Sequence, residues 1–425
     1  MSLSCNSSLT SIRITSSELQ TRAGKLLEHV TEKRLSGVVL FDNYYILYLT
    51  GFAFIPTERP IAFLMNARGE KAMFVPRLER EHAVSETGFE RVVDYVEYPC
   101  DPHPFQILKK TLDSMGISGD IGADNDGYPW IYGYRGPSLS ELTGANVIKV
   151  SAFLEDAMMI KSEAEVNLIR ESVKWGNLAH RLLQRYTKVG ATETEVSLRA
   201  SHEATLAMLD TLGPLYRSQS LFHEGASAGY RGQIGRNAAI PHALANNITF
   251  QAGDVLVTGA GAVVWGYTSE LERTMVVGRP SEGQREMFAH MKKAQEVAFD
   301  ALRPGARCSD VDRAVRLYYE ENSLPVASPA PGGQQRRESD SDFRGLMPFW
   351  KHHTGHAIGL RMHEGPFLDV GDHTVIRPRM VFTVEPGFYA PDMGGFRHSD
   401  TLVVLDDGIE ILTYYPRELE SLIID

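Results

Sequence analysis

The chain has 425 residues, of which 43% are hydrophobic and 23% charged, and its formal net charge is -11 at neutral pH. This length exceeds one typical domain and indicates two, each long enough to bury a hydrophobic core. The acidic balance argues against nucleic acid or an anionic membrane as the main partner. Its three cysteines, Cys5, Cys100 and Cys308, lie far apart, which favours a reducing compartment over a disulfide framework or a thiolate metal site.

Residues 1–155 predict a small α/β domain. The polar start lacks the apolar core of a signal peptide, and no segment reaches the ~18 consecutive apolar residues of a membrane span, so we expect a cytoplasmic protein. Apolar residues at helical spacing mark residues 17–35, and a glycine closes a second predicted helix over 104–116. Short apolar runs predict strands at 37–41, 44–52, 61–66, 71–76, 91–98, 120–124 and 146–150.

Residues 156–425 predict a larger α+β domain built on antiparallel sheet. Three helices open with a capping box, in which Glu or Gln follows Ser or Thr by three residues. The stretch 328–345 is rich in Pro, Gly and charge, and it predicts a mobile loop. The capping pairs are Ser162 with Glu165, Thr192 with Glu195 and Ser281 with Gln284, and the main strands are expected at 254–261, 266–278, 380–390 and 398–413.

Histidine and carboxylate residues gather in five stretches of this second domain. Charged groups beside apolar strand residues are costly to bury unless they are paired or used. The five stretches can converge only if the sheet closes around a pocket, so their joint occurrence favours a functional site. They are RNAAIPHALANN with His242, GYTSELERT with Glu270 and Glu272, KHHTGHAIGLRMHEGP with His352, His353, His356, His363 and Glu364, FTVEPGFYA with Glu385, and GGFRHSDT with Arg397, His398 and Asp400.

The order of these motifs resembles the creatinase, prolidase and methionine aminopeptidase superfamily, peptidase family M24. PHA, SELERT, TGHAIG, MHEGP, VEPGFY and GGFRHSDT follow one another over most of residues 155–415. YLTGF and MIKSEAEVNLIR resemble the amino-terminal domain and the joining helix of the prolidase and creatinase branches. The resemblance implies a pita-bread fold for the second domain, a creatinase-like first domain and a homodimer.

The metal ligands that this resemblance implies are incomplete. Metal-dependent members hold two divalent ions through two Asp, one His and two Glu, a set suited to manganese or cobalt. Three of these ligands correspond to Glu270, His356 and Glu385, but the other Asp and Glu correspond to Gly259 and Ser399, which carry no carboxylate. We therefore expect no dinuclear centre and no metal cofactor. The alternative is a site for one or two divalent ions such as Mn, Co or Zn, the mononuclear form using the three remaining ligands.

One branch of the superfamily offers a metal-free precedent. ELERT resembles the ALERT segment of creatinase, a member that hydrolyses a C–N bond without metal, whereas MHEGP is peptidase-like. Arg361 stands where dipeptidases more often carry an acidic or neutral residue, so the resemblance does not transfer a substrate. Gly259 and Gly261 are interpreted as room for a substrate at the place where relatives hold their ions.

Without a metal, side chains must take the proton of water and protonate the leaving nitrogen. We assign these steps first to His242, because a free imidazole titrates near neutrality. The two glutamates would orient it or divide the acid and base roles, and the other histidines would stabilise an oxyanion or position the substrate. The predicted catalytic residues are His242, Glu270, His356, His363 and Glu385, and the predicted substrate-binding residues are Arg361, Tyr267 and Arg397.

The other polar residues of the motifs have a structural interpretation. Glu272 and Arg273 are expected to pair on the outer face, unless strand alternation turns Glu272 inward beside Glu270. Asp400 is expected to cap or to pair with Arg397. His352, His353 and His398 are expected at the surface or behind the site, Trp265 and Tyr267 as packing or pocket-wall residues, and Cys308 as a structural thiol.

These features predict a hydrolase that cleaves an amide or amidino C–N bond of a small substrate without a dinuclear metal centre. One alternative is a metallopeptidase of the Xaa-Pro dipeptidase or aminopeptidase type with an altered site. Another is a non-catalytic pita-bread binding protein, against which the set of retained histidines and glutamates argues. The expected partner is a small molecule or dipeptide, with neither nucleic acid nor membrane involved.

Overall fold

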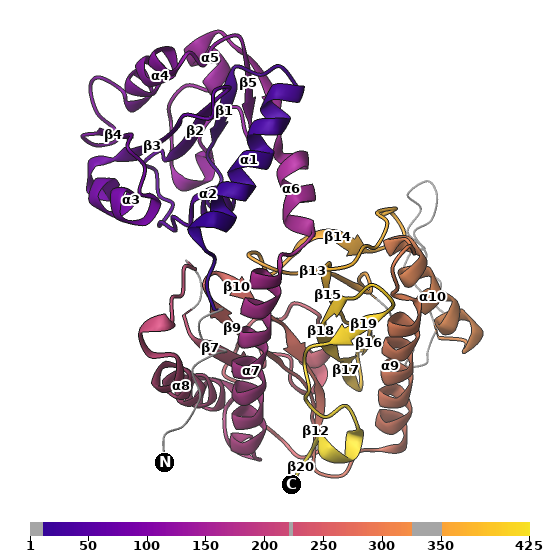
Figure 1. Ribbon diagram of the computed structural model, residues 1–425. Coiled ribbons are helices and arrows are strands. Elements are labelled where there is room, and N and C mark those ends of the chain that lie inside the picture. The colour runs from indigo at the N-terminus through magenta and orange to yellow at the C-terminus, as the bar shows by residue number, and fades with distance from the viewer. Residues whose placement is uncertain (1–11, 221–223, 325–350) are drawn as a thin grey trace, which may run out of the picture. The chain divides into compact units, whose positions relative to one another are not determined.

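The computed structural model describes residues 12–220, 224–324 and 351–425, so the predicted loop at 328–345 lies outside the described residues. The chain forms two compact units, Ile14–Met158 and Met159–Asp425, and the described residues before Ile14 are grouped with the second (Figure 1). No described helix is both long and apolar enough to cross a membrane.

The first unit is built on a mixed six-stranded sheet with the order β4-β3-β2-β1-β5-β6. β1 pairs antiparallel with β2 and parallel with β5. Side chains of α4 and α5, such as Phe105, Leu112 and Leu139, share a buried cluster with Val39 and Phe74 of the sheet. The strands are β1 (Gly37–Leu40), β2 (Ala62–Asn66), β3 (Lys71–Pro76), β4 (Val92–Tyr95), β5 (Asp120–Ala123) and β6 (Asn146–Lys149), and the helices are α1 (Ser16–Glu32), α2 (Asn43–Thr50), α3 (Arg80–Thr87), α4 (Pro104–Met115), α5 (Leu139–Thr143) and α6 (Ser151–Met159).

Helix α2 corrects one strand prediction. The apolar run at 44–52 was expected to be a strand, but it forms the helix Asn43–Thr50. Asp42 accepts hydrogen bonds from the backbone N–H groups of Tyr44 and Tyr45 and thereby caps the first turn, and Gly51, with φ of 76°, ends the helix. A short run that is apolar on every side fits a buried helix as well as a buried strand, so only these end signals distinguish the two.

The second unit is dominated by antiparallel sheet, as predicted. Its largest sheet has nine strands among the described residues, in the order β10-β9-β11-β18-β15-β13-β14, with β7 beside β9 and β19 beside β18. β8, β12 and β20 form a second sheet, and β16 and β17 a hairpin. The strands are β7 (Ala226–Gly229), β8 (Val255–Val257), β9 (Gly259–Val264), β10 (Tyr267–Thr268), β11 (Leu271–Glu272), β12 (Thr274–Val277), β13 (Gly355–Ala357), β14 (Glu364–Leu368), β15 (Val381–Val384), β16 (Gly387–Ala390), β17 (Gly394–Arg397), β18 (Ser399–Val404), β19 (Ile409–Ile411) and β20 (Ile423–Ile424).

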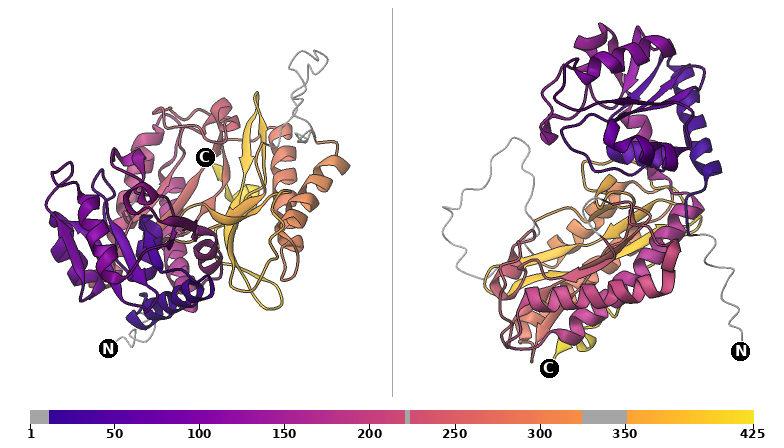
Figure 2. Two further views of the ribbon diagram at one scale, coloured as in Figure 1. Left: turned by 90° about the horizontal axis from the view of Figure 1, so that it is seen from above. Right: turned by 90° about the vertical axis from the view of Figure 1, so that its left-hand side faces the viewer.

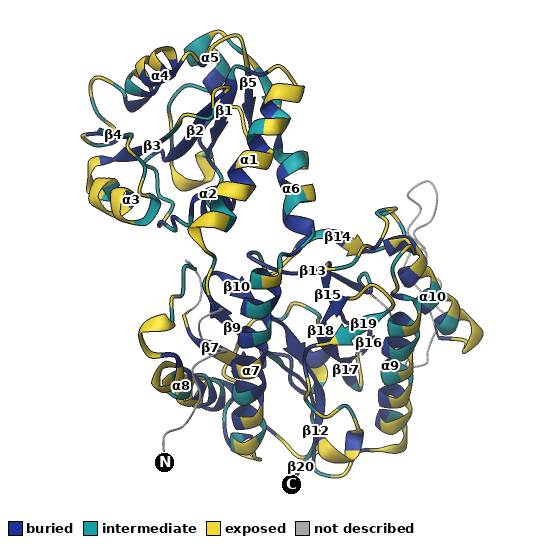
Figure 3. Cartoon of the chain, viewed as in Figure 1, coloured by how far each residue is buried: buried dark blue, intermediate teal, exposed yellow. Residues whose placement is uncertain are grey.

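Two pairs of helices flank these strands: α7 (Glu163–Tyr186) with α8 (Glu193–Leu212), and α9 (Glu282–Ala301) with α10 (Cys308–Glu321). α7 packs on β9 and α8 on β7, whereas α9 packs on β15, β16 and β17 and α10 on β14 (Figures 1 and 2). The helices expose one face to solvent, while most strand residues are buried (Figure 3).

The predicted capping residues begin their helices. Ser162 and Ser281 each complete a reciprocal capping box, with Glu165 and Gln284 respectively. The Thr192 hydroxyl accepts the Glu195 backbone N–H, which is one half of that arrangement. The start of α7, α8 and α9 is therefore determined by local side-chain chemistry.

The two central predicted strands are each broken where the chain passes from one sheet to another. β8 pairs with β12 in the small sheet, whereas β9 pairs with β11 in the large one. Thr258 and Arg273 lie at this crossing, where the Thr258 N–H donates to the Arg273 carbonyl at 3.0 Å and the Arg273 N–H donates to the Thr258 hydroxyl at 2.9 Å. The break directs Glu270 and Glu272 into the large sheet.

Candidate active site

Glu270, His356 and Glu385 converge on one point of the large sheet. Glu270 lies just before β11, His356 on β13 and Glu385 just after β15, and the order β11-β18-β15-β13 brings these strands together. Nε2 of His356 lies 3.2 Å from Oε1 of Glu385 and 4.0 Å from Oε2 of Glu270. We call these three residues the acid–histidine cluster. Three of the five sequence stretches thus contribute a side chain to one point.

Threonine side chains and backbone groups fix the position of each member of the cluster. The Thr401 hydroxyl accepts the backbone N–H of Glu270 and donates to its carbonyl. The Thr383 hydroxyl accepts the His356 N–H at 3.2 Å and donates to its carbonyl, and the Glu385 N–H donates to the Thr354 carbonyl at 2.7 Å.

The cluster divides its protons unequally. Burial, followed by the charges of Glu385 and Glu272, raises the pKa of Glu270 to about 7. Burial alone would lower the pKa of His356, but its contact with Glu385 and the charge of Glu270 raise it to about 9. Burial opposes ionisation of Glu385 too, yet His356 and Arg397 hold its pKa well below the usual range. Near neutrality the cluster thus contains a carboxylate, an imidazolium and a carboxyl group poised to exchange a proton.

A second charged group adjoins the cluster. Both carboxylate oxygens of Glu272 accept hydrogen bonds from Arg397, and Oε1 also accepts one from Nη2 of Arg231 at 2.6 Å. Nε of Arg397 lies 3.8 Å from Oε2 of Glu385, which joins the two groups. Nη1 of Arg397 donates to the Tyr389 hydroxyl at 2.9 Å.

This arrangement corrects the predicted partners of three residues. Glu272 and Arg273 do not pair on the outer face, because both are buried and their charged groups form ion pairs with different residues. Glu272 points inward to Arg397, the arrangement that strand alternation allowed. Arg273 pairs with Asp400 at 2.7 Å in a fully buried contact, so Asp400 does not pair with Arg397.

The two glycines opposite the charged strand have different roles. A Cβ atom on Gly261 would lie 2.3 Å from the Ser269 carbonyl oxygen, so glycine is required there by close backbone approach. A Cβ on Gly259 would meet only ordinary contacts, with Nη2 of Arg231 and Oε1 of Glu272 each at 3.6 Å. The interpretation that both glycines leave room for a substrate is therefore wrong for Gly261.

The charged groups present here do not fit a dinuclear metal centre. Gly259 faces the Arg231 guanidinium, and the Ser399 hydroxyl donates to Oε1 of Glu270 at 2.7 Å. A cation beside Gly259 and a hydroxyl at Ser399 take the places where two bridging carboxylates would be needed. The residues present could hold a single ion, because Glu270, His356 and Glu385 each offer a ligand atom and these atoms lie within 4.8 Å of one another.

Further imidazoles surround His356. The His363 ring stacks on it with centroids 3.8 Å apart, and the His353 ring lies edge-on with centroids 6.1 Å apart. Burial lowers the pKa of His363 to about 4, and the charges of His356, His353 and His242 add to this effect. The charge of Glu385 opposes it. His242 is exposed and lies within electrostatic reach of this stack.

The predicted substrate-binding residues occupy different environments. Tyr267 is buried, and its hydroxyl donates to Oε1 of Glu165 at 2.7 Å, which accounts for it as a packing residue. Arg397 is buried, and each of its side-chain nitrogens contacts a protein group, so it positions Glu272 and Glu385. Arg361 is half-buried, and its role in binding stays a prediction.

The residues that were expected at the surface, behind the site or in a structural role also lie in different environments. His398 is buried, with its ring against Phe288, which is inconsistent with a surface position. His352 lies behind the site, where its Nε2 is 2.6 Å from the Tyr389 hydroxyl. Cys308 is buried in α10, and burial raises the pKa of its thiol to about 12, as a structural thiol requires.

Sequence reasoning missed three contributors to this region. These residues are Arg231, Tyr389 and Lys161, and none of them was among the predicted site residues. Lys161 forms a buried pair with Glu364 of the MHEGP motif at 2.8 Å. The φ of 53° at Arg231 is invisible in sequence, but its place beside Gly232 was an available signal.

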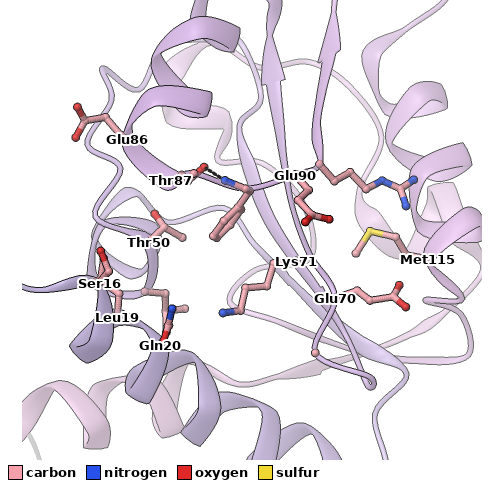
Figure 4. A pocket seen from close by; sticks show the side chains of 15 residues that line it. Ser16, Leu19, Gln20, Thr50, Glu70, Lys71, Glu86, Thr87, Glu90 and Met115 are labelled. Carbon is pink, nitrogen blue, oxygen red and sulfur yellow. Dashed lines mark hydrogen bonds between the residues drawn. The ribbon is translucent and has the colours of Figure 1, made fainter.

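A separate cavity of about 540 Å³ lies in the first unit. Figure 4 shows that its lining includes Lys71, Glu70, Glu90 and Thr87, with the Thr87 hydroxyl accepting the Phe89 N–H. None of the predicted site residues lines this cavity. The acid–histidine cluster belongs to the second unit and is the candidate active site.

An antiparallel sheet unit that carries buried carboxylates around a histidine, preceded by a smaller α/β unit, defines the pita-bread class of hydrolase. The chain belongs to metallopeptidase family M24, whose family model matches residues 167–406. The creatinase/prolidase N-terminal domain model matches residues 22–160. The protein is therefore a hydrolase of this superfamily acting on C–N bonds, with a creatinase-like first domain.

Relatives resemble the whole chain. It is 26% identical to the Xaa-Pro dipeptidase of Pyrococcus horikoshii over 403 residues, which cover 94% of this chain and 99% of the relative. It is 27% identical to the probable dipeptidase PepE of Mycobacterium bovis over 392 residues, 91% and 92% of the respective chains.

Solved structures establish the same fold. The dipeptidase PepE of Mycobacterium ulcerans has a TM-score of 0.76 at 24% identity, covering 97% of this chain and 99% of that one. The Xaa-Pro dipeptidase of Bacillus anthracis has a TM-score of 0.74 at 23% identity, covering 95% and 99%.

Proposed function

We propose that the protein hydrolyses a C–N bond of a small substrate without a dinuclear metal centre. The observation that carries this proposal is the occupation of the two missing ligand positions: Arg231 lies against Gly259, and the Ser399 hydroxyl binds Glu270. A guanidinium beside a metal ion would repel it, and too few carboxylates remain to balance two divalent ions. The relatives named as Xaa-Pro dipeptidases make a dipeptide one candidate substrate.

The acid–histidine cluster can supply the proton transfers. We give the general-base step to Glu270 instead of His242, because Glu270 belongs to the buried cluster and His242 is exposed. As a carboxylate, Glu270 would take a proton from water while the water oxygen attacks the carbon of the C–N bond. The imidazolium of His356, held by Glu385, would stabilise the developing oxyanion. When the tetrahedral intermediate collapses, the proton on Glu270 would pass to the leaving nitrogen. His242 and His363 are proposed to position the substrate or to relay this proton. Arg361 is proposed to bind the substrate.

Metal analysis and chelation test the proposal together. The protein would be purified without added metal, treated exhaustively with a chelator, and assayed with dipeptides, creatine-like amidino compounds and ectoine-like cyclic amidines. We expect well under one divalent ion per chain and unchanged turnover after chelation. Two equivalents of manganese, cobalt or zinc would overturn the proposal, and so would the absence of turnover with every substrate class, the latter in favour of a binding protein.

A second candidate is a metallopeptidase with one ion held by the acid–histidine cluster. It is favoured by His356, whose Nδ1 lies 3.0 Å from the Ala357 carbonyl oxygen and leaves Nε2 facing both glutamates. Such a backbone contact commonly orients a metal-binding imidazole. One equivalent of metal, with dipeptide hydrolysis lost on chelation and restored by the ion, would establish this candidate.

A further inference from the structure

The three carboxylates of the site already have partners. Glu272 accepts hydrogen bonds from Arg397 and Arg231, and Glu385 is balanced by His356 and Arg397. Glu270 accepts the Ser399 hydroxyl and faces His356. A cationic substrate group would therefore find no carboxylate without a partner among these three.

Arg231 is a charged group beside these carboxylates that has binding capacity left. Its side chain is 48% exposed, whereas Arg397 is 3% exposed. Only Nη2 is engaged, with Glu272 at 2.6 Å and Gln233 at 3.4 Å. Within the described residues, Nε and Nη1 of Arg231 have no hydrogen-bond or ion-pair partner. A guanidinium with two available nitrogens matches the geometry of a carboxylate.

The backbone holds Arg231 at this place despite a strained conformation. Its φ is 53°, in the left-handed region that non-glycine residues rarely adopt. The N–H of the next residue, Gly232, donates to Glu193 at 2.7 Å and anchors the turn. β7 pairs with β9 so that Gly229 lies opposite Gly259, and the chain reaches Arg231 two residues later. This turn places the Arg231 guanidinium beside Gly259, on the side where a Cβ atom would point.

We infer that Arg231, beside the open face of Gly259, binds the carboxylate of an amino-acid-derived substrate. The inference rests on the proposed function and names its substrate class. Glu272, the partner of Arg231, is two residues from Glu270 along the chain, a separation of about 7 Å in extended backbone. A carboxylate on Arg231 therefore lies within the length of a small molecule from the acid–histidine cluster. Arg231 acts here as a specificity residue, and the cluster retains the chemistry.

Matched acid and amide ligands test this inference by binding. Calorimetry on chelator-treated protein would compare glycyl-proline with glycyl-prolinamide, and creatine with creatinamide. We expect the wild type to bind at least one acid about ten- to a hundredfold more tightly than its amide, as a charge-assisted hydrogen bond implies. Arg231→Gln should remove that preference while amide affinity is retained, and Arg231→Lys should restore part of it.

Arg236→Gln is the matched control, because Arg236 is a nearby exposed arginine in the short turn Gly235–Ala239. It should keep the full acid preference. The inference fails if the wild type prefers no acid in either pair, if Arg231→Gln keeps the preference, or if that variant weakens acid and amide equally. Binding does not depend on turnover. An Arg231-dependent preference in protein that hydrolyses nothing would thus overturn the proposed function and leave this subsite standing.

Discussion

Glu270 combines two properties that rarely coincide in one buried carboxyl group. It is held in place at both backbone atoms by Thr401 and at one oxygen by Ser399, yet its proton remains exchangeable near neutrality. Burial and then the nearby charges of Glu385 and Glu272 disfavour its ionisation, while His356 and Ser399 favour it. This balance suits a group that first accepts a proton and then returns it.

The pH dependence of kcat/KM should report this balance. The proposed metal-free mechanism requires Glu270 as a carboxylate and His356 as an imidazolium. We expect kcat/KM to rise with pH through about 7 and fall through about 9, the values to which the pKa of each residue is raised. Measurement of kcat/KM between about pH 5 and pH 10 at constant ionic strength checks this. Glu270→Gln should abolish turnover without unfolding the protein.

Ser399→Ala is the informative companion variant. The Ser399 hydrogen bond lowers the pKa of Glu270, so its loss should move the rising limb of the profile to higher pH. A profile whose rising limb lies well below neutrality in both proteins would show that Glu270 is already locked as an anion, as a bound ion would make it, and would contradict metal-free chemistry.

At this scale the sequence predicted which motifs converge but not how their charges pair. The resemblance of SELERT, TGHAIG and VEPGFY to the motifs of family M24 implied that Glu270, His356 and Glu385 share one site, and their side chains do lie together. The partner of Glu272 depended on which face of β11 it occupies and on Arg231, which is brought in by a turn with positive φ. Strand alternation allowed the inward position of Glu272, and Gly232 marked a turn beside Arg231, but neither pattern identified the partner of Glu272.

Strand β9 requires glycine at residue 261 but has room for a Cβ atom at residue 259. Gly261 lies against Ser269, and a Cβ on Gly176 of α7 would come within 2.9 Å of the Gly261 Cα atom. Helix α7 and strand β9 thus approach each other through two residues without side chains. Gly259 has no such neighbour.

Gly261→Ala should therefore destabilise the second unit, by about 1–3 kcal/mol or more, because the backbone of β9 must shift away from its neighbours. Gly259→Ala is the matched control and should change the free energy of unfolding by about 0.5 kcal/mol or less. Urea denaturation followed by circular dichroism measures both. Equal losses of stability in the two variants would contradict the different roles assigned to these glycines.

The ion pair of Arg273 with Asp400 joins β18 to the chain between β11 and β12. Asp400 also accepts hydrogen bonds from Gln295 of α9 at 2.9 Å and from Thr413 at 2.6 Å. Asp400→Asn would leave the fully buried guanidinium of Arg273 without its counter-charge. We expect a loss of about 3–5 kcal/mol in the free energy of unfolding.

The control for this variant is an ion pair at the surface. Arg285 and Glu420 lie 3.6 Å apart and are both exposed, so Arg285→Gln should cost less than about 1 kcal/mol. Urea denaturation at neutral pH compares the two variants directly. A loss below about 1 kcal/mol for Asp400→Asn would mean that the neighbouring hydrogen-bond donors alone hold this junction.

Element prediction succeeded where local signals were strong. The caps of α7 and α9 determined where these helices begin. It failed for α2, whose apolar run has no periodicity, and at Thr258, where a single residue moves the chain between two sheets. Sheet membership depends on which strand each half pairs with, β12 for β8 and β11 for β9, and the local apolar pattern contains no information about that choice.

For the whole molecule, the charge balance of the site differs from that of the chain. The chain carries a formal charge of -11, yet the site sets Glu270, Glu272 and Glu385 against three basic residues, His356, Arg231 and Arg397. From this balance we expect the site to fold without a divalent cation. Electrostatic attraction of the acidic surface for cations is therefore distinct from specific metal binding.

Thermal unfolding distinguishes these two kinds of cation effect. An ion bound at a hundred times its Kd stabilises a protein by about 2.7 kcal/mol, which raises the midpoint of a unit this size by roughly 5–10 °C. We expect manganese, cobalt or zinc at millimolar concentration to move the wild-type midpoint by less than about 1 °C, a small fraction of the shift that linkage predicts for a filled site. The variant Gly259→Asp with Ser399→Glu should respond little more, because Arg231 would pair with the new carboxylate. Adding Arg231→Gln to that variant should produce the metal-dependent rise, which would identify the guanidinium as the group that excludes the second ion.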